Sequence, residues 1–401
     1  MVNADFMIVR FFSRLKLACV VLATFPSVFL SANADGALSN QFFVYFGTYT
    51  GAKSRGIYVS RLDTTTGKLS APVLAAESVD PAYLAIAPDH HFLFAVNETK
   101  RFKDQAGGSV SAFKLDSSTG KLAFVNQQPS GGIDPCHLVV DPGGNYVLVA
   151  NYTSGSVAVF PVETNGFLGR ATAVVQHRGS SVNPERQTGP HAHCVAMDAA
   201  NHRVFVCDLG LDKVMIYRLN EANGELTPEE IPSAGLKPGS GPRHIAFSPD
   251  GRYAYVLNEM GGTLTAFAYN PEHGALNEIQ TVSTLPEDFR GKNTSAEVAL
   301  VPSGKFIYAS NRGDDSIAVF AVDEISGRLS FGERQPCHGK TPRCFAIDPT
   351  GQYLIAANQN SDNVVIFRID AQSGKLTCTG QTVEVGKPVC VTFVPIKTAT
   401  P

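Results

Sequence analysis

Seven copies of one short pattern recur along this chain, at intervals of about 50 residues. Each copy has a turn, an alternating apolar segment of the form G/D-x-[ILV]-x-[VAI]-[FY], and a closing G-x-L. The first copy, RGIYVSRLDTTTGKL, begins at Arg55, and the last, DNVVIFRIDAQSGKL, begins at Asp362. Alternating apolar side chains are typical of a half-buried β-strand, and the glycine indicates a tight connection to the next strand.

A second pattern precedes six of these copies and predicts a hairpin of two apolar strands. It reads P-x-x-Φ-x-Φ-x-P-x-G-x-Φ-Φ-Φ-Φ-x-N, where Φ is an apolar residue, and each unit therefore has four strands. The remaining unit is split between the two ends of the chain. KPVCVTFVP, from Lys387, would supply its first strand, and QFFVYFGTY, from Gln41, would supply its second. Pairing these two segments closes a ring, which removes the free strand edges of a linear array.

These features predict an all-β fold, a seven-bladed β-propeller over residues 41–395 whose ring closes by pairing the C-terminal strand with the N-terminal blade. A solenoid would need capping units and gives no reason for the split unit. The 36 glycines and 24 prolines of the 401 residues agree with many short strands joined by turns. A hydrophobic content of 44% and a net charge of −3 exclude a long disordered chain and give no electrostatic case for a nucleic-acid partner.

The beginning of the chain resembles an export signal. Basic residues precede the apolar segment LACVVLATFPSVFL (17–30), which is short for a bilayer-spanning helix, and an A-N-A cleavage site follows at 32–34. We therefore expect residues 1–34 to be a cleavable signal peptide and residues 396–401 to be a short tail. The mature protein would be periplasmic or secreted, with no stable membrane insertion. An uncleaved membrane anchor is the alternative.

Signal cleavage would leave seven cysteines, an odd number that cannot all pair within one chain. Because no C-x-x-C spacing occurs, a zinc site is not expected. Small buried thiols are the favoured interpretation, since most of these cysteines lie in predicted strands. Cys194 and Cys207 are the one pair that could meet across a hairpin.

The predicted strand order gathers polar residues at one end of the ring. The first two strands of a unit form an antiparallel hairpin, so the start of the first strand lies beside the end of the second. In GPRHIAFSPDGRYAYVLNE this brings Arg243 to Glu259, whereas the related hairpin TPRCFAIDPTGQYLIAANQ has Gln359 in place of the glutamate. The residues collected in this way are Asn97, Glu98, His137, Asn151, Tyr152, His191, His193, Asp208, Arg243, His244, Asn258, Glu259, Glu297, Asn311, Arg312, Arg343, Asn358 and Gln359.

The recurring asparagine is interpreted as structural, because asparagine readily bonds the backbone at a strand end. The residues that differ between units instead predict a site built from unlike blades. An inner ring of ion pairs that only satisfies the central channel is the alternative. His90 and His91 fall in a turn on the opposite face and are expected to be exposed surface residues.

One connection is much longer than its counterparts and carries further polar residues. The segment QHRGSSVNPERQTGPHAH (176–193) would bring Arg178, Arg186, His191 and His193 toward the same end of the ring. Long loops in compact folds are often functional. Two histidines at i and i+2 could bind a metal, but a third ligand is not evident, so no metal or other cofactor is expected.

Several of these segments resemble the seven-bladed lactonase family, which includes propeller-type 6-phosphogluconolactonases and fungal carboxymuconate cycloisomerases. They are GPHAH, GPRHIAFSPDGRYAYVLNE, LPEDF…SAEVALVPSGKFIYASNR and the seven G-x-L hairpins, and the resemblance covers residues 41–395. It implies hydrolysis or formation of a lactone ring that carries an anionic group, without a metal. The residues that match the proposed catalytic set of the cycloisomerases are His193, Arg243, Glu259 and Arg312.

Lactone hydrolysis requires a base for water, a positive group for the developing oxyanion and an anchor for substrate charge. Glu259 or His193 could be the base, and Arg243 could stabilise the oxyanion. The guanidinium fork matches phosphate and carboxylate, which makes other arginines candidate anchors. The predicted anchors and further substrate-binding residues are Arg186, Arg312, Arg343, His137, His191 and Glu297.

We therefore expect a carboxylic ester hydrolase that opens a sugar-acid lactone, with 6-phosphogluconolactone as the family default and 6-phosphogluconate as its product. The export signal departs from this expectation, because phosphogluconolactone arises in the cytosol. Three alternatives stay open: a non-catalytic binding or scaffold propeller of the cell envelope, a lactone-forming cycloisomerase, and a calcium-dependent lactonase.

Overall fold

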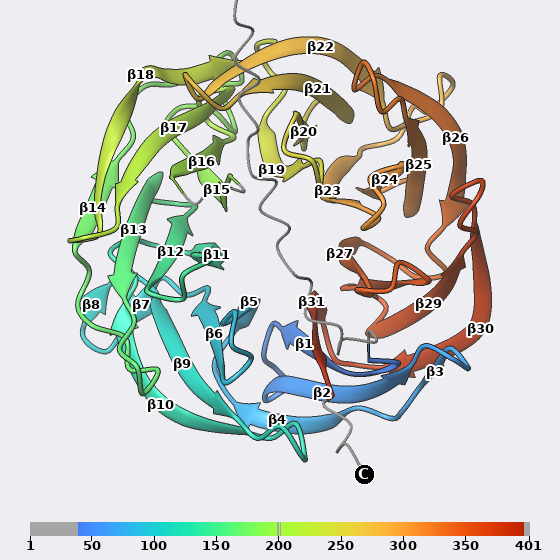
Figure 1. Ribbon diagram of the computed structural model, residues 1–401, viewed down its shortest axis with the longest axis horizontal. Helices are drawn as coiled ribbons and strands as arrows, with labels where there is room; N and C mark the ends of the chain where they lie inside the picture. Colours follow the sequence, from blue (N-terminus) through green and yellow to red (C-terminus); the bar gives the residue numbers. More distant parts are fainter. Residues whose placement is uncertain (1–38, 199, 201, 397–401) are drawn as a thin grey trace, which may run out of the picture. The chain divides into compact units, whose positions relative to one another are not determined.

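The computed structural model describes residues 39–396, apart from residues 199 and 201, so the predicted signal peptide lies outside the described residues. Seven antiparallel sheets are arranged as blades around a central axis (Figure 1). The predicted seven-bladed propeller is therefore confirmed. None of the described residues lies in a helix with the length and hydropathy that crossing a membrane requires.

The first four blades are numbered here in chain order, and their strands are given from the axis outward. Blade 1 combines β31 (Pro388–Pro395), β1 (Gln41–Thr48), β2 (Gly56–Asp63), β3 (Lys68–Leu69) and β4 (Val73–Glu77). Blade 2 combines β5 (Pro81–Ile86), β6 (Phe92–Asn97), β9 (Ser109–Leu115) and β10 (Leu122–Pro129). Blade 3 combines β11 (Pro135–Val140), β12 (Tyr146–Asn151), β13 (Ser156–Pro161) and β14 (Ala173–Gln176). Blade 4 combines β15 (Ala192–Met197), β16 (Arg203–Asp208), β17 (Lys213–Asn220) and β18 (Glu225–Gly235).

The remaining three blades follow the same order. Blade 5 combines β19 (Pro242–Phe247), β20 (Tyr253–Asn258), β21 (Thr263–Asn270) and β22 (Ala275–Ser283). Blade 6 combines β23 (Thr294–Leu300), β24 (Phe306–Arg312), β25 (Ser316–Val322) and β26 (Leu329–Pro336). Blade 7 combines β27 (Pro342–Ile347), β28 (Tyr353–Asn358), β29 (Asn363–Ile369) and β30 (Leu376–Glu384). A two-stranded hairpin, β7 (Arg101–Phe102) with β8 (Gln105–Ala106), projects between β6 and β9.

The ring closes as the split unit predicts. The C-terminal β31 pairs antiparallel with β1, and Tyr45 lies opposite Thr392 in this register. Figure 1 shows β31 beside the axis with the N-terminal strands outside it. β1 is thereby paired on both sides, with β2 and with β31, so that neither of its edges is left free.

The core lies between neighbouring blades. On β1, Phe43 and Tyr45 pack toward blade 2, whereas Phe42 and Phe46 pack toward blade 7. Because side chains alternate between the two faces of a strand, both faces of a blade are covered by its neighbours. This explains why the second strand of each unit is apolar at nearly every position rather than at every other one.

The glycine of the repeated G-x-L pattern lets neighbouring blades approach closely. Gly120 has a φ of +74°, and a Cβ at this position would lie 2.8 Å from the ring of Phe43 in blade 1. Tyr45 of the same strand donates a hydrogen bond to the Gly120 carbonyl at 2.8 Å. The glycine is therefore required by the backbone conformation and by contact with the adjacent blade.

Candidate active site

A repeated β-bulge aims side chains at one mouth of the central channel. In blade 5, Pro242 pairs with Asn258 and His244 pairs with Leu257, so Arg243 is the extra residue. The same register shift makes Cys136, His193 and Arg343 the extra residues of blades 3, 4 and 7. A bulge re-aims the side chain it carries, and bulges are common beside active sites.

A second set of side chains reaches this mouth from the residue directly after the recurring asparagine. Three of the four bulged residues named above and four post-asparagine residues, with one arginine from the long loop, enclose a cavity of about 230 Å³. The residues lining the cavity are Glu98, Cys136, Tyr152, Arg186, His193, Glu259, Arg312 and Arg343.

Glu259 is held by three arginines. Its Oε1 lies 2.8 Å from Arg186 Nη2, and its Oε2 lies 2.8 Å from Arg312 Nη2 and 3.1 Å from Arg243 Nε. Burial opposes ionisation, but the three guanidinium groups outweigh it and lower the pKa of Glu259 to about 2. The carboxylate is therefore ionised at neutral pH, and both of its oxygens are engaged.

Arg243 lies behind Glu259 rather than on the cavity wall. Its side chain is 3% exposed, and its Nη1 donates to the carbonyl of Ala296 and, at 3.1 Å, to His244 Nε2. A guanidinium group can only donate, so His244 Nε2 accepts the hydrogen bond from Arg243. The ring proton of His244 is therefore on Nδ1. That Nδ1 donates to Glu297 Oε1 at 2.8 Å. Glu297 thus orients His244, and His244 orients Arg243, from the interior of the ring.

The long loop predicted at 176–193 positions Arg186 over the cavity. Asn183 Oδ1 accepts the backbone N–H groups of Glu185 and Arg186 at 2.9 and 3.0 Å, which forms a tight turn. Gln187 is fully buried and donates to the Leu209 carbonyl at 2.8 Å, which attaches the loop to blade 4. Arg178, from the start of the same loop, is exposed and does not line the cavity.

Three predicted histidines take different places around the mouth. His193 lines the cavity, and its Nδ1 is buried without a hydrogen-bond partner among the described residues. Burial, with Arg243, His244 and other cations nearby, lowers the pKa of His193 well below its usual value, so the ring is neutral. His191 stacks on Tyr152 with ring centres 4.6 Å apart, and its Nδ1 lies 3.0 Å from the Tyr152 carbonyl.

His137 lies deeper, outside the lining of the cavity. Its ring packs against Tyr83 with centres 4.1 Å apart, and its Nε2 lies 3.6 Å from Cys194 Sγ. Burial, followed by His244 and Arg243, lowers the pKa of His137 well below its usual value. Of the nine predicted site residues, the cavity wall thus gathers Arg186, His193, Glu259, Arg312 and Arg343. Those outside it are His137, His191, Arg243 and Glu297.

A second ionic cluster on the cavity wall joins the predicted anchor Arg343 to Glu98 and Tyr49, which were not predicted as site residues. Glu98 Oε2 accepts a hydrogen bond from the Tyr49 hydroxyl at 2.7 Å and lies 3.7 Å from Arg343 Nη2. The guanidinium carbon of Arg343 also lies 5.4 Å from the centre of the Tyr49 ring. The signal for Glu98 is present in the repeat, because Glu98 follows Asn97 just as Glu259 follows Asn258.

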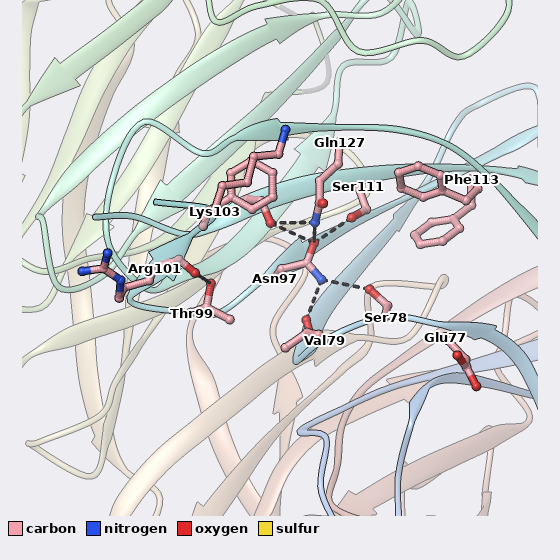
Figure 2. A pocket seen from close by; sticks show the side chains of 13 residues that line it. Glu77, Ser78, Val79, Asn97, Thr99, Arg101, Lys103, Ser111, Phe113 and Gln127 are labelled. Carbon is pink, nitrogen blue, oxygen red and sulfur yellow. Dashed lines mark hydrogen bonds between the residues drawn. The ribbon is translucent and has the colours of Figure 1, made fainter. Parts of the chain in front are cut away.

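The recurring asparagine is structural, as the sequence predicts, but its partners lie in neighbouring segments. Figure 2 shows Asn97 among the side chains that line a second cavity, to which Arg101 and Lys103 also contribute. The volume of this cavity is about 360 Å³. Its Nδ2 donates to Ser78 Oγ at 2.9 Å and to the Val79 carbonyl at 2.6 Å. Its Oδ1 accepts from Ser111 Oγ at 2.7 Å and from Gln127 Nε2 at 3.0 Å. The side chain thus ties the connection entering blade 2 to the strands of that blade.

Among the described residues, no group of three or more histidine, cysteine, aspartate or glutamate side chains could hold a metal ion. Cys194 and Cys207 do face each other across the β15–β16 hairpin, as the sequence suggests. Both are free thiols in the structure. The turn residues His90 and His91 differ slightly, since His91 is exposed and His90 is half-buried.

A seven-bladed ring that carries buried arginines, carboxylates and a neutral histidine at one mouth has the groups that ester chemistry on an anionic substrate requires. The model of the family of seven-bladed β-propeller lactonases matches residues 43–393, and the chain belongs to this family.

Named relatives agree with this membership. The chain is 41% identical over 349 residues to a 6-phosphogluconolactonase of Bacillus subtilis, covering 87% of this chain and 97% of that protein. It is 34% identical over 310 residues to a 6-phosphogluconolactonase of Formosa agariphila, covering 76% and 86% of the two chains. The solved periplasmic gluconolactonase of Pseudomonas aeruginosa superposes with a TM-score of 0.84 at 38% identity, covering 89% of this chain and all of the other.

Proposed function

We propose that the protein is a carboxylic ester hydrolase that opens a six-carbon sugar-acid lactone, with 6-phosphogluconolactone as its leading substrate. The observation that carries the choice is the charge around the cavity. Arg186, Arg312 and Arg343 line it and Arg243 lies directly behind, whereas Glu98 and Glu259 are the two carboxylates on its wall. On the wall itself, three positive charges against two negative ones leave an excess of one, which favours an anionic substrate such as a phosphorylated lactone.

The arginines have two tasks in this proposal. One or more of them would hold the phosphate, since the guanidinium fork matches its oxygens. Another would stabilise the negative charge that develops on the lactone carbonyl oxygen when water attacks, in a cavity where little water screens the interaction. Arg312 and Arg343 are largely buried, at 13% and 17% exposure of their side chains, and are best placed for the second task.

Glu259 supports this chemistry by holding the arginines and is a poor candidate for the base. A general base works best when its pKa lies near the working pH, and the pKa of Glu259 is about 2. Both of its oxygens are already engaged by guanidinium groups. A lactone-forming cycloisomerase would use the same arginines, and hydrolysis is preferred here because the named relatives are lactonases.

The proposal also includes export of the enzyme from the cytosol. The predicted signal peptide and the similarity to a periplasmic gluconolactonase of Pseudomonas aeruginosa support action outside the cytosol. An exported enzyme would meet unphosphorylated aldonolactones, so gluconolactone is the second candidate substrate.

Initial rates on 6-phosphogluconolactone, gluconolactone and a panel of other aldonolactones, with and without a chelator, test the proposal. We expect opening well above the spontaneous rate, a higher kcat/KM for the phosphorylated lactone, and no effect of the chelator. Rates equal to the spontaneous background on every lactone would refute a hydrolase. A preference for unphosphorylated lactones would select gluconolactone as the substrate.

A further inference from the structure

The cavity holds a second carboxylate whose surroundings are opposite to those of Glu259. We infer that Glu98, oriented by Tyr49 and Arg343, is the general base that activates the attacking water; this assignment rests on the proposed lactonase function. The repeat places Glu98 at the mouth of the ring, but neither the repeat nor the lactonase names of the relatives assign it a role. The inference stands on where Glu98 lies, which of its oxygens is free and what charge results when it accepts a proton.

The geometry leaves one oxygen of Glu98 available. Its Oε2 makes two contacts, the hydrogen bond from Tyr49 at 2.7 Å and the ion pair with Arg343 at 3.7 Å. Its Oε1 has no partner among the described residues, and the residue lines the cavity. Glu259 differs, because both of its oxygens face arginines. A base must offer a free lone pair within reach of the proton that it abstracts.

Charge favours Glu98 over His193 as the proton acceptor. His193 would become a cation on accepting a proton, beside Arg243, Arg312 and Arg343, and these charges already lower its pKa. Glu98 would become neutral, which burial favours. Burial raises the pKa of Glu98 above its usual value, although Arg343 and the Tyr49 hydrogen bond act in the opposite direction. The pKa of Glu98 is thus raised, whereas the pKa of Glu259 is lowered. Enzymes commonly assign different acid–base roles to two carboxylates through such a difference in pKa.

The other titratable groups near Glu98 come from two further segments, the start of β11 and β19. Asp134, before β11, raises the pKa of Glu98, and Arg243, on β19, lowers it. Cys136, on β11, is neutral, because burial raises the pKa of its thiol well above the usual value. One hydrogen bond and two arginines therefore stabilise the ionised form of Glu98, whereas burial favours its protonated form.

The reaction balances without any co-reactant. Glu98 Oε1 takes a proton from water while the water oxygen forms a bond to the lactone carbonyl carbon, and the carbonyl oxygen becomes the oxyanion. When the tetrahedral intermediate collapses, the bond between the carbonyl carbon and the ring oxygen breaks. Glu98 returns its proton to that ring oxygen, which leaves as a hydroxyl group. The new carboxylic acid loses its proton to solvent, and Glu98 is again ionised.

The test compares Glu98→Gln with Tyr49→Phe and His193→Gln on the better lactone, with the spontaneous rate subtracted. Glu98→Gln should lower kcat by about 10²–10⁴-fold, the range of general base catalysis, with KM changed by only a few-fold. In a profile of kcat/KM against pH, the wild-type value should fall at acidic pH as Glu98 is protonated. This acidic limb of the profile should be absent in Glu98→Gln. Tyr49→Phe removes a donor to the carboxylate, so its acidic limb should move to higher pH. His193→Gln should keep the limb.

The outcomes separate the inference from the proposed function. A wild-type protein without lactonase activity would overturn both. An active wild type whose acidic limb survives in Glu98→Gln but disappears in His193→Gln would overturn the assignment of Glu98 alone and leave the lactonase intact. If Glu98→Gln does not fold, judged by circular dichroism, the shift of the limb in Tyr49→Phe decides. No shift there would reject Glu98 as the base.

Discussion

Arg186 Nη2 lies 2.8 Å from Glu259 Oε1 across the mouth of the ring, although Arg186 comes from the loop before blade 4 and Glu259 directly follows β20 in blade 5. The same guanidinium donates to the Tyr152 hydroxyl of blade 3 at 3.0 Å. One loop residue therefore joins three blades around the cavity. Because its side chain is 38% exposed, it is the most accessible arginine of the Glu259 cluster and is available to a substrate.

Replacing Arg186 should weaken substrate binding more than folding. An exposed ion pair contributes little stability, but a charge-assisted hydrogen bond to phosphate contributes about 1.5–3 kcal/mol to binding. Arg186→Ala should therefore raise the KM for 6-phosphogluconolactone by about 10–100-fold and change the KM for gluconolactone much less. Arg178→Ala, an exposed arginine of the same loop, is the matched control and should change neither. Equal effects of Arg186→Ala on both lactones would contradict a role in holding phosphate.

The Glu259 cluster should make the stability of the protein depend on acidic pH. The pKa of Glu259 is about 2 in the folded protein, against a usual value of 4.5. A lowered folded pKa contributes stability that is present above the unfolded pKa and is lost as pH falls toward the folded one. The contribution is roughly 3 kcal/mol, lost between about pH 4.5 and pH 2.

Urea unfolding of wild type and Glu259→Gln at several pH values measures this contribution. The difference in unfolding free energy between the two proteins should be largest above pH 5 and should shrink as pH falls. This comparison cancels the other carboxylates, which titrate in both proteins. A difference that stays constant from pH 6 to pH 3 would show that the three arginines do not lower the pKa of Glu259.

The fold followed from the sequence because its determinants are repeated. Seven copies of a strand pattern average out local irregularities, and the split unit specifies how β31 and β1 close the ring. The meeting of Arg243 and Glu259 beside the candidate cavity followed for the same reason, since the hairpin of blade 5 brings them to one end. Both inferences need only the strand order.

The orientation of individual side chains did not follow, because the bulge at the start of each inner strand is not visible in the pattern. In blade 3 the sequence pattern predicts His137 as a site residue and assigns Cys136 no role there. The register shift instead aims Cys136 into the cavity and leaves His137 behind it. The inward position of Arg243 and the second cluster around Glu98 depend on the same bulged geometry and on contacts between blades.

The recurring asparagine should be costly to remove. Asn311 is fully buried, donates to the Thr284 carbonyl at 3.0 Å, and accepts from Ser295 Oγ at 2.7 Å. Each buried polar group left unsatisfied by Asn311→Ala costs about 1–3 kcal/mol. Urea unfolding should show this loss, whereas Asn360→Ala, which removes an exposed hydrogen bond of blade 7, should change stability by less than about 0.5 kcal/mol. Equal losses for the two variants would contradict the structural role.

The cysteines should differ sharply in reactivity with a thiol reagent. The seven cysteines of the described residues are free, and Cys378 is half-buried while the other six are buried. Burial raises the pKa of Cys194 and Cys337 to about 12, so their thiolate fraction at neutral pH is minute. The native protein should therefore show one fast thiol, absent in Cys378→Ser, and the unfolded mature protein should show seven. A total of five would indicate that one pair, such as Cys194 and Cys207, is oxidised.

Ring closure should make the last strand indispensable. β31 supplies the inner strand of blade 1, where Val391 packs in the core with Phe42 and Phe46. A stop after Lys387 would remove this strand, expose the edge of β1 and open the apolar contacts on both of its sides. We expect such a protein to be insoluble or to lack a cooperative thermal transition. A stop after Ile396 is the control and should leave the transition unchanged, because β31 ends at Pro395 and Ile396 keeps its hydrogen bonds to Gln41 and Ser39. A cooperative transition in the shorter protein would show that blade 1 is stable without its C-terminal strand.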